Sequence, residues 1–180
     1  MEVTPTNIPE ALVLTPRVFG DERGFFLESY NRQTFAKLGI DYEFVQDNHA
    51  RSTGNVLRGL HYQIKQPQGK LVRVVAGEVF DVAVDLRRNS PTFGKWTGIY
   101  LTDKEKKLFW VPPGFAHGYF VLSDEAEFLY KTTDFYAPEH ERCIRWDDPD
   151  LAIKWPISNG PPILSEKDKN GCLFKGAEYF

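Results

Sequence analysis

The sequence predicts a mainly β protein: one domain spanning residues 1–180, folded as a jelly-roll β-barrel with few short helices. Short runs rich in β-branched and aromatic residues recur along the chain, most of them bounded by Gly, Pro, Asn or Asp. Strands and helices do not alternate, which argues against a parallel nucleotide-binding sheet. No internal repeat or low-complexity linker divides the chain. Many short strands within one domain are typical of a sandwich or barrel.

The expected elements follow from local composition. The expected strands are Phe25–Tyr30, Glu43–Asn48, Val56–Gln63, Lys70–Ala76, Val79–Leu86, His117–Leu122 and Phe128–Tyr136. Gly77 lies between two of these runs and predicts a tight hairpin turn. The range Asn31–Leu38 is the one good helical candidate, because Phe35 and the last residue are three positions apart. We expect a looser C-terminal segment after Trp146.

The charge balance excludes one class of partner and leaves another open. The chain has 22 basic and 25 acidic residues, a net charge of −3, and no block of like charges. Nucleic acid is therefore not expected as a main partner, although a few arginines can still hold a small anionic ligand. No stretch approaches the length of a membrane span, and Ala11–Leu14 is too short for a secretory signal. We expect a cytoplasmic location.

Two segments carry histidines in a recognisable context. Pro112–His117 is a proline-glycine turn that leads into a histidine, and His61 stands in the middle of an upstream strand. Together they resemble the two half-motifs of the cupin superfamily, whose metal-binding members usually carry H-x-H in the first motif. Here the second histidine is replaced by Gln63, a poor ligand for zinc or iron. We therefore expect no metal and no cofactor.

Three polar side chains suggest acid–base chemistry. Lys70 shares a strand face with two valines, and an ammonium inside a barrel needs a partner or a function. Tyr130 and Tyr136 share one face if their strand is regular. Strand histidines and inward tyrosines are by default core residues. Taken together, however, His61, Lys70 and Tyr130 supply a base, a cation and an acid, which suits proton removal beside a ketone.

Five ordered segments closely resemble the dTDP-4-dehydrorhamnose 3,5-epimerases, and the resemblance runs from about residue 2 to about residue 175. The segments are Arg17–Ser29, Phe44–His49, Val56–Gln63, Trp110–Gly118 and Leu164–Asp168. The resemblance implies cofactor-independent conversion of dTDP-4-keto-6-deoxyglucose to dTDP-4-keto-L-rhamnose, in dTDP-L-rhamnose biosynthesis. It also implies a homodimer that exchanges N-terminal strands, and a segment such as Ala11–Thr15 suits addition to a partner's sheet edge.

The resemblance also implies roles for individual residues. His61 matches the family's general base, and Asp168 matches the carboxylate that pairs with it. Tyr130 matches the acid that protonates the sugar from the opposite face, and Lys70 the cation that stabilises the enolate. Tyr136 matches a tyrosine close to the keto group. Positions matching those that hold the nucleotide and sugar are Arg23, Glu28, Gln46, Asn48, Arg58, His117, Glu141 and Lys167, with Phe26 a candidate ring for stacking on the base.

Two of these implications go beyond what local pattern supports. In a regular strand Arg58 and His61 face opposite sides, so both line one cavity only if Gly59 introduces a bulge or twist. Asp168 is over a hundred residues from His61, and its charged neighbourhood, Glu166–Lys169, by itself predicts a solvated loop.

Four other functions remain open at this stage. An epimerase that inverts only carbon 3 or only carbon 5 needs the same base and acid. A ketoisomerase of this fold is a second alternative, and a non-catalytic sugar-nucleotide-binding cupin, which would lack the base or the acid, is a third. A metal-dependent cupin enzyme is the last and is disfavoured by Gln63.

Overall fold

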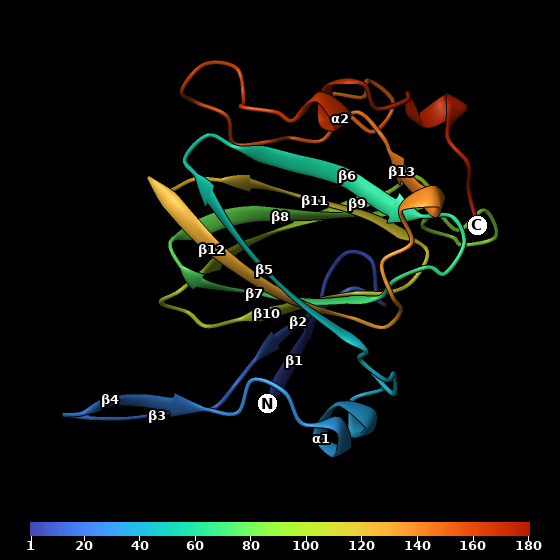
Figure 1. Ribbon diagram of the computed structural model, residues 1–180. Coiled ribbons are helices and arrows are strands. Elements are labelled where there is room, and N and C mark those ends of the chain that lie inside the picture. Colours follow the sequence, from blue (N-terminus) through green and yellow to red (C-terminus); the bar gives the residue numbers. More distant parts are fainter.

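The computed structural model describes residues 1–180 and confirms the mainly β class. Two antiparallel sheets lie face to face and form the flattened barrel seen in Figure 1. The six-stranded sheet has the order β1 (Glu2–Pro5), β2 (Leu12–Thr15), β10 (Leu108–Val111), β7 (Lys70–Ala76), β12 (Glu125–Thr132) and β5 (Gln46–Thr53). The five-stranded sheet has the order β13 (Glu141–Cys143), β6 (Leu57–Gln63), β11 (Phe115–Val121), β8 (Glu78–Asp85) and β9 (Trp96–Thr102).

The remaining elements are small and lie outside the barrel. They are the hairpin of β3 (Val18–Asp21) and β4 (Gly24–Leu27), the helices α1 (Arg32–Lys37) and α2 (Glu166–Lys169), and 3-10 turns at Pro138–His140 and Phe174–Gly176. None of the helices is long and apolar enough to cross a membrane.

The core fills the space between the two sheets. Side chains alternate along each strand, so Val72 and Val74 of β7 face inward and meet Phe109 of β10 in the largest buried cluster. Phe128 of β12 stacks on Tyr119 of β11 with ring centroids 4.3 Å apart, which ties one sheet to the other. This packed interior is the floor of the cavity described below.

The strand predictions are confirmed in kind, with shifted ends. Lys70–Ala76 has the predicted bounds. The strand expected at Glu43–Asn48 instead begins at Gln46 and runs to Thr53. Its partner β12 begins at Glu125 and ends at Thr132, because the two strands pair along their whole length. Tyr136 therefore lies beyond the strand in which it was predicted.

The turn at Gly77 is a correction to the predicted hairpin. β7 pairs with β10 and β12, whereas β8 pairs with β11 and β9, so the two strands that flank Gly77 belong to different sheets. The chain changes sheets here with Gly77 at a φ of 79°, and a Cβ at this position would lie 2.1 Å from a backbone oxygen. Sequence pattern identified the turn but not the strand pairing, which depends on distant residues.

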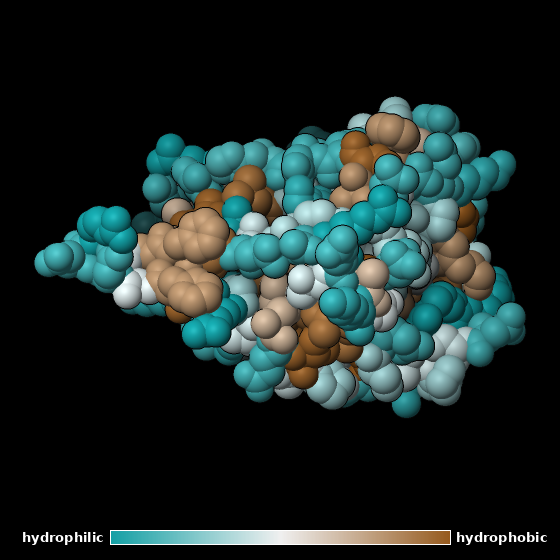
Figure 2. All heavy atoms as spheres, turned by 90° about the horizontal axis from the view of Figure 1, so that it is seen from below, coloured by the Kyte–Doolittle hydropathy of each residue, from teal (hydrophilic) through white to brown (hydrophobic).

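The segment around α1 packs on the outer face of the six-stranded sheet, where Phe35 meets Leu71 and Leu108. Asn31 caps α1: its side-chain oxygen accepts hydrogen bonds from the backbone N–H groups of Gln33 and Thr34, as expected of a helix that begins there. Just before α1, the β3–β4 hairpin projects from the body (Figure 1), and Figure 2 shows apolar residues along it. Phe25 and Phe26 are 61% and 70% exposed. Lys106, in the loop between β9 and β10, lies over the Phe25 ring at 3.8 Å from its centroid, but both rings remain largely open to solvent.

Two further expectations concern the ends of the chain. Ala11–Thr15 was expected to suit addition to a partner's sheet edge, and this stays a prediction. Within this chain β2 pairs on both sides, with β1 and β10, and β1 forms the edge of the sheet. The segment after Trp146 contains no strand, yet it packs against the outside of the five-stranded sheet through Leu151, Trp155 and Phe180. Backbone bridges on either side of α2, Ile163 with Val56 and Cys172 with Ile144, hold that helix beside the sheet.

Candidate active site

A cavity of about 360 Å³ opens between the two sheets. The six-stranded sheet contributes Lys70 and Tyr130, while the five-stranded sheet contributes His61 and His117. The other lining residues are Gln46, Asn48, Ala50, Arg58, Gln68, Gly118, Tyr119, Phe128, Tyr136, Glu141 and Lys167. Titratable groups of both signs therefore converge in one hollow, which is the usual character of an active site.

His61 and Asp168 meet in the cavity wall. The His61 Nε2 atom lies 2.6 Å from Asp168 Oδ1, and the Asp168 side chain is only 3% exposed. The carboxylate also accepts the Gly59 N–H at 3.2 Å and the Ser165 hydroxyl at 2.6 Å. Burial raises the pKa of Asp168, but the hydrogen bonds from His61 and Ser165 outweigh burial and hold the pKa below its usual value. The pair is a charged carboxylate that orients an imidazole.

Helix α2 places this carboxylate. Ser165 is its N-cap and accepts the Asp168 N–H at 3.2 Å, so one serine fixes both the backbone and the side chain of Asp168. The charged stretch that by itself predicted a solvated loop is thus a short helix, and Asp168 is its one buried residue.

A bulge at Gly59 brings Arg58 and His61 into the same cavity. His61 is opposite His117 and Arg58 is opposite Tyr119. Between these two pairs β6 contains one residue more than β11, which is the pattern of a β-bulge. Gly59 has a φ of 126°, and a Cβ there would lie 2.5 Å from the Gly118 Cα. The bulge that was required for Arg58 and His61 to line one cavity is therefore present.

Lys70 and Tyr130 face the histidines from the other sheet. Burial lowers the pKa of Lys70 to about 8, although Asp81 and Glu141 act in the opposite direction. Burial raises the pKa of Tyr130. At neutral pH the lysine is therefore a cation that gives up its proton more easily than usual, and the phenol keeps its proton.

His117 has a buried partner that sequence reasoning missed. Its Nε2 atom lies 2.8 Å from Asp81 Oδ1, and Asp81 is fully buried with Oδ2 unpaired. Burial lowers the pKa of His117, although the Asp81 carboxylate acts to raise it. The available signal was a charged residue in the middle of an otherwise apolar run, Val79–Val84, since such a charge requires a partner.

A second network lies where Glu141 and Lys167 line the cavity. Glu141 accepts hydrogen bonds from Lys167 Nζ at 2.6 Å and from the Tyr136 hydroxyl at 2.9 Å. The Tyr136 N–H donates to Gln46 Oε1 at 3.1 Å, and Gln46 donates in turn to Asn48 at 2.9 Å. The hydrogen bond to Glu141, with some burial, raises the pKa of Tyr136. Five of the predicted binding residues are therefore joined by direct contacts.

Three predicted binding residues are not among those that line the cavity of this chain. Arg23 pairs with Asp21 at the tip of the β3–β4 hairpin. Phe26 is on the same hairpin and is largely exposed, and Glu28 follows it and accepts a hydrogen bond from Asn31 at 3.1 Å. The predicted site residues therefore fall into two groups: those in or beside the cavity, and these three on or next to the hairpin.

Gln63 stands where metal-binding cupins carry a histidine, and its side-chain amide is hydrogen-bonded to backbone groups. Its amide nitrogen donates to the carbonyls of Gln66 and Phe135, and its oxygen accepts the Ala137 N–H at 2.9 Å. It anchors the loop that carries Tyr136 into the cavity.

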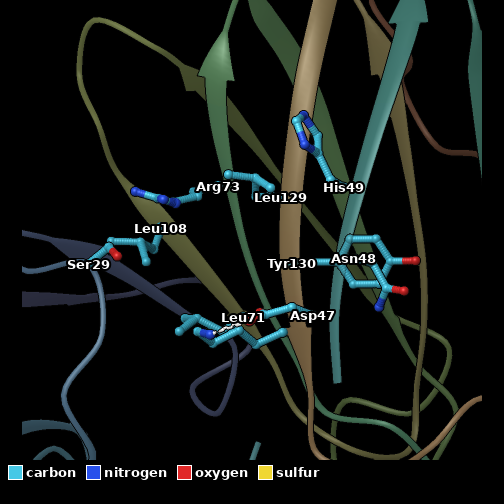
Figure 3. Close-up of a pocket in the computed structure, with 10 residues that line it drawn as sticks. Ser29, Asp47, Asn48, His49, Leu71, Arg73, Leu108, Leu129 and Tyr130 are labelled. Carbon is cyan, nitrogen blue, oxygen red and sulfur yellow. Dashed lines mark hydrogen bonds and ion pairs between the residues drawn. The ribbon is translucent and has the colours of Figure 1, made fainter. Parts of the chain in front are cut away.

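A second hollow of about 290 Å³ lies on the outer face of the six-stranded sheet (Figure 3). Tyr130 and Asn48 point to the opposite side of the sheet from Arg73 and Leu108 in this view. Two basic side chains of the outer hollow are paired with carboxylates: His49 lies 3.1 Å from Glu127, and Lys131 donates to Asp47 at 2.9 Å. We therefore assign the chemistry to the cavity between the sheets.

Comparison with known proteins agrees with this geometry. The family model for dTDP-4-dehydrorhamnose 3,5-epimerase matches residues 5–176. The dTDP-4-dehydrorhamnose 3,5-epimerase of Pseudomonas aeruginosa is 61% identical over 100% of this chain and 99% of its own. The epimerase structure from Legionella pneumophila, in complex with dTDP-4-keto-L-rhamnose, is 52% identical with a TM-score of 0.96, covering 98% of this chain and 94% of that one.

A relative with a narrower activity has the same fold. The 3'-monoepimerase from Streptomyces bikiniensis, in complex with dTDP-quinovose, is 33% identical with a TM-score of 0.88 and covers 94% of this chain and 86% of its own. The family match over nearly the whole chain nevertheless confirms the resemblance found in the sequence. The chain belongs to the dTDP-4-dehydrorhamnose 3,5-epimerase family.

Proposed function

We propose that this chain catalyses the 3,5-epimerisation of dTDP-4-keto-6-deoxyglucose to dTDP-4-keto-L-rhamnose without a cofactor. The observation that carries the proposal is the placement of His61 and Tyr130 on opposite sheets across one cavity. Inversion of a carbon requires removal of a proton from one face and its return from the other. A base and an acid on facing walls supply both operations.

His61 acts as the base in this proposal. Its Nε2 atom is hydrogen-bonded to Asp168, which leaves Nδ1 to take the proton from the sugar. The charged Asp168 then stabilises the imidazolium that forms. Because the ketone at carbon 4 acidifies the C–H bonds at carbons 3 and 5, one base serves both centres in turn.

Lys70 and Tyr130 complete each inversion. Removal of the proton leaves an enolate whose charge rests on the carbon-4 oxygen, and the Lys70 ammonium stabilises that charge. Tyr130 gives its phenolic proton to the opposite face, which reforms the C–H bond with inverted configuration. Solvent then returns a proton to Tyr130 and removes one from His61, so no net proton is gained or lost.

The cavity also suits an anionic nucleotide sugar. Arg58 and Lys167 supply positive charge along its wall, and forked guanidinium donors bind phosphate oxygens well. Asn48 Nδ2 is buried without a partner and is available as a further donor to the ligand. His117, Tyr136, Gln46 and Glu141 complete the contacts proposed for the sugar and nucleotide.

We propose a homodimer that completes the site. The β3–β4 hairpin, which carries Arg23 and Phe26, projects from the chain's own barrel (Figure 1), and Phe26 is 70% exposed. In a dimer the hairpin reaches the partner's cavity, where Arg23, Phe26 and Glu28 contact the nucleotide. Light scattering should give twice the chain mass, and R23A should raise KM more than it lowers kcat.

Proton exchange with solvent tests the proposed reaction. The protein is incubated with dTDP-4-keto-6-deoxyglucose in deuterated water and the sugar protons are followed by NMR. Deuterium at both carbon 3 and carbon 5 supports the 3,5-epimerase. No exchange at either carbon, despite tight binding, refutes catalysis on this substrate and favours a sugar-nucleotide-binding protein.

A single-centre epimerase is the second candidate. It is favoured by the structural similarity to a 3'-monoepimerase, and the same base and acid would serve it. Exchange at only one carbon identifies it. The cytoplasmic location and the absence of a nucleic-acid partner stay predictions.

A further inference from the structure

We propose that Cys143 and the His61–Asp168 pair form a binding site for a thiophilic divalent cation such as Zn²⁺, and that occupation of this site inhibits the enzyme. The proposal goes beyond the epimerase reaction proposed above, in which no metal takes part, and its inhibition half rests on that proposed function. Its starting point is that one ligand atom each from His61, Cys143 and Asp168 lies within 4.8 Å of the other two.

The strand register explains why Cys143 is beside the base. Leu60 and Ile144 exchange both backbone hydrogen bonds, each at 3.0 Å, so the next pair along β6 and β13 is a non-hydrogen-bonded pair. That pair is His61 and Cys143, and side chains of such pairs approach each other most closely. Glu141, two residues earlier on β13, lines the cavity, so Cys143 is on the cavity face of its strand.

The neighbouring residues leave room for the thiol and hold the carboxylate still. A Cβ on Gly171 would lie 3.1 Å from Cys143 Sγ, so the sulfur packs closely against a residue that has no side chain. Gly59 and Ser165 hold the oxygens of Asp168 from outside the cluster. Such supporting hydrogen bonds orient the ligands of metal sites and contribute to their affinity.

The three ligands match the chemistry of zinc. Imidazole, thiolate and carboxylate are its preferred donors, with bonds of about 2.0 to 2.3 Å. Tetrahedral bonds of this length separate ligand atoms by about 3.3 to 3.7 Å, so the 2.6 Å contact between His61 and Asp168 must widen, while the thiol already lies within 4.8 Å of the other two ligand atoms. A thiolate and a carboxylate also neutralise the charge of the ion.

Binding would remove the base from the reaction. The metal takes the place of the proton between His61 Nε2 and Asp168 Oδ1. That proton moves through solvent to Nδ1, so the neutral imidazole coordinates through Nε2 and its Nδ1 can no longer accept a proton from the sugar. Cys143 releases its thiol proton to solvent on coordination. Asp168 can then no longer orient the imidazole for proton transfer. The fourth coordination position is left for water. Magnesium, which prefers oxygen ligands in octahedral geometry, should not bind here.

Two cysteine variants provide a matched test. Cys172 is the only other cysteine and is exposed, so C172S controls for surface thiols. The chelator-treated full-length protein is titrated with Co²⁺, whose bond to a thiolate gives a charge-transfer absorption, and Zn²⁺ is then added in competition. We expect this absorption in the wild type and in C172S and its absence in C143S, with Zn²⁺ abolishing it.

Inhibition is measured on the same proteins. Loss of a supporting hydrogen bond alone costs a metal site about 10–100-fold in affinity, so loss of the thiolate should raise the Zn²⁺ concentration for half-inhibition at least tenfold in C143S. Chelator should restore activity. The proposal is overturned if wild type and C143S are equally sensitive to Zn²⁺. It is also overturned if the cobalt absorption is lost in C172S and kept in C143S, or if Zn²⁺ binds without inhibiting the enzyme. If the metal-free protein has no epimerase activity, the cobalt band still reports on the site, so the two failures are distinguishable.

Discussion

The pH dependence of the reaction follows from the burial of Lys70. Its pKa is lowered to about 8 because burial disfavours the ammonium more than Asp81 and Glu141 favour it. The charged form is therefore present at lower pH and is lost as the pH rises through about 8. A group with this pKa is about 90% protonated at pH 7 and about 10% protonated at pH 9. If only the cation stabilises the enolate, kcat/KM should fall about tenfold between these two values.

Tyr130 does not account for the same decline, because burial raises its pKa above the ordinary value for a phenol. The assay is the epimerisation rate at substrate concentrations well below KM, where kcat/KM reports the titration of the free enzyme. K70R is the matched variant, since a guanidinium stays charged throughout this range. Its remaining activity should show no decline near pH 8. An alkaline limb that is the same in K70R and the wild type would refute this reasoning.

The remaining predictions concern the dyad and the fold. D168N should keep the fold, seen by circular dichroism, and lower kcat by at least about 100-fold, since a neutral amide neither fixes the imidazole tautomer nor stabilises its charge; a loss of less than tenfold would contradict the role of Asp168. Phe109→Ala, which empties part of the core between the sheets, should lower the free energy of unfolding by about 3–5 kcal/mol in urea titrations, and no change would contradict its burial. Asn31→Ala removes the cap of α1 and should cost about 1 kcal/mol, an amount that Asn31→Asp should largely avoid.

Local pattern predicted the parts of the fold that depend on neighbouring residues. Lys70–Ala76 was predicted with its observed bounds, and the helix after Asn31 was predicted to within a residue at each end. The hairpin at Gly77 was wrong, because strand pairing is decided by partners elsewhere in the chain. β7 finds its neighbours in β10 and β12, which lie more than 30 residues away.

The same division applies to the site. His61, Lys70 and Tyr130 were identified from strand pattern and chemistry, but Asp168 was placed beside His61 only through the family resemblance. The contact spans 107 residues and depends on the capped turn at Ser165. Asp81 was missed although a buried charge in an apolar run was visible. Arg23 was grouped with the cavity residues, and no sequence pattern reveals that its hairpin points away from its own barrel.

The most direct test of a base and an acid on opposite walls is solvent exchange in Y130F. His61 remains in this variant and can remove a proton from the sugar and return a deuteron to the same face, whereas inversion needs a donor on the other wall. We predict that NMR in deuterated water shows deuterium entering the sugar with the starting configuration retained, and little inverted product. Inversion at the wild-type rate in Y130F would contradict the central claim, because the proton would then come to the second face from a group other than Tyr130.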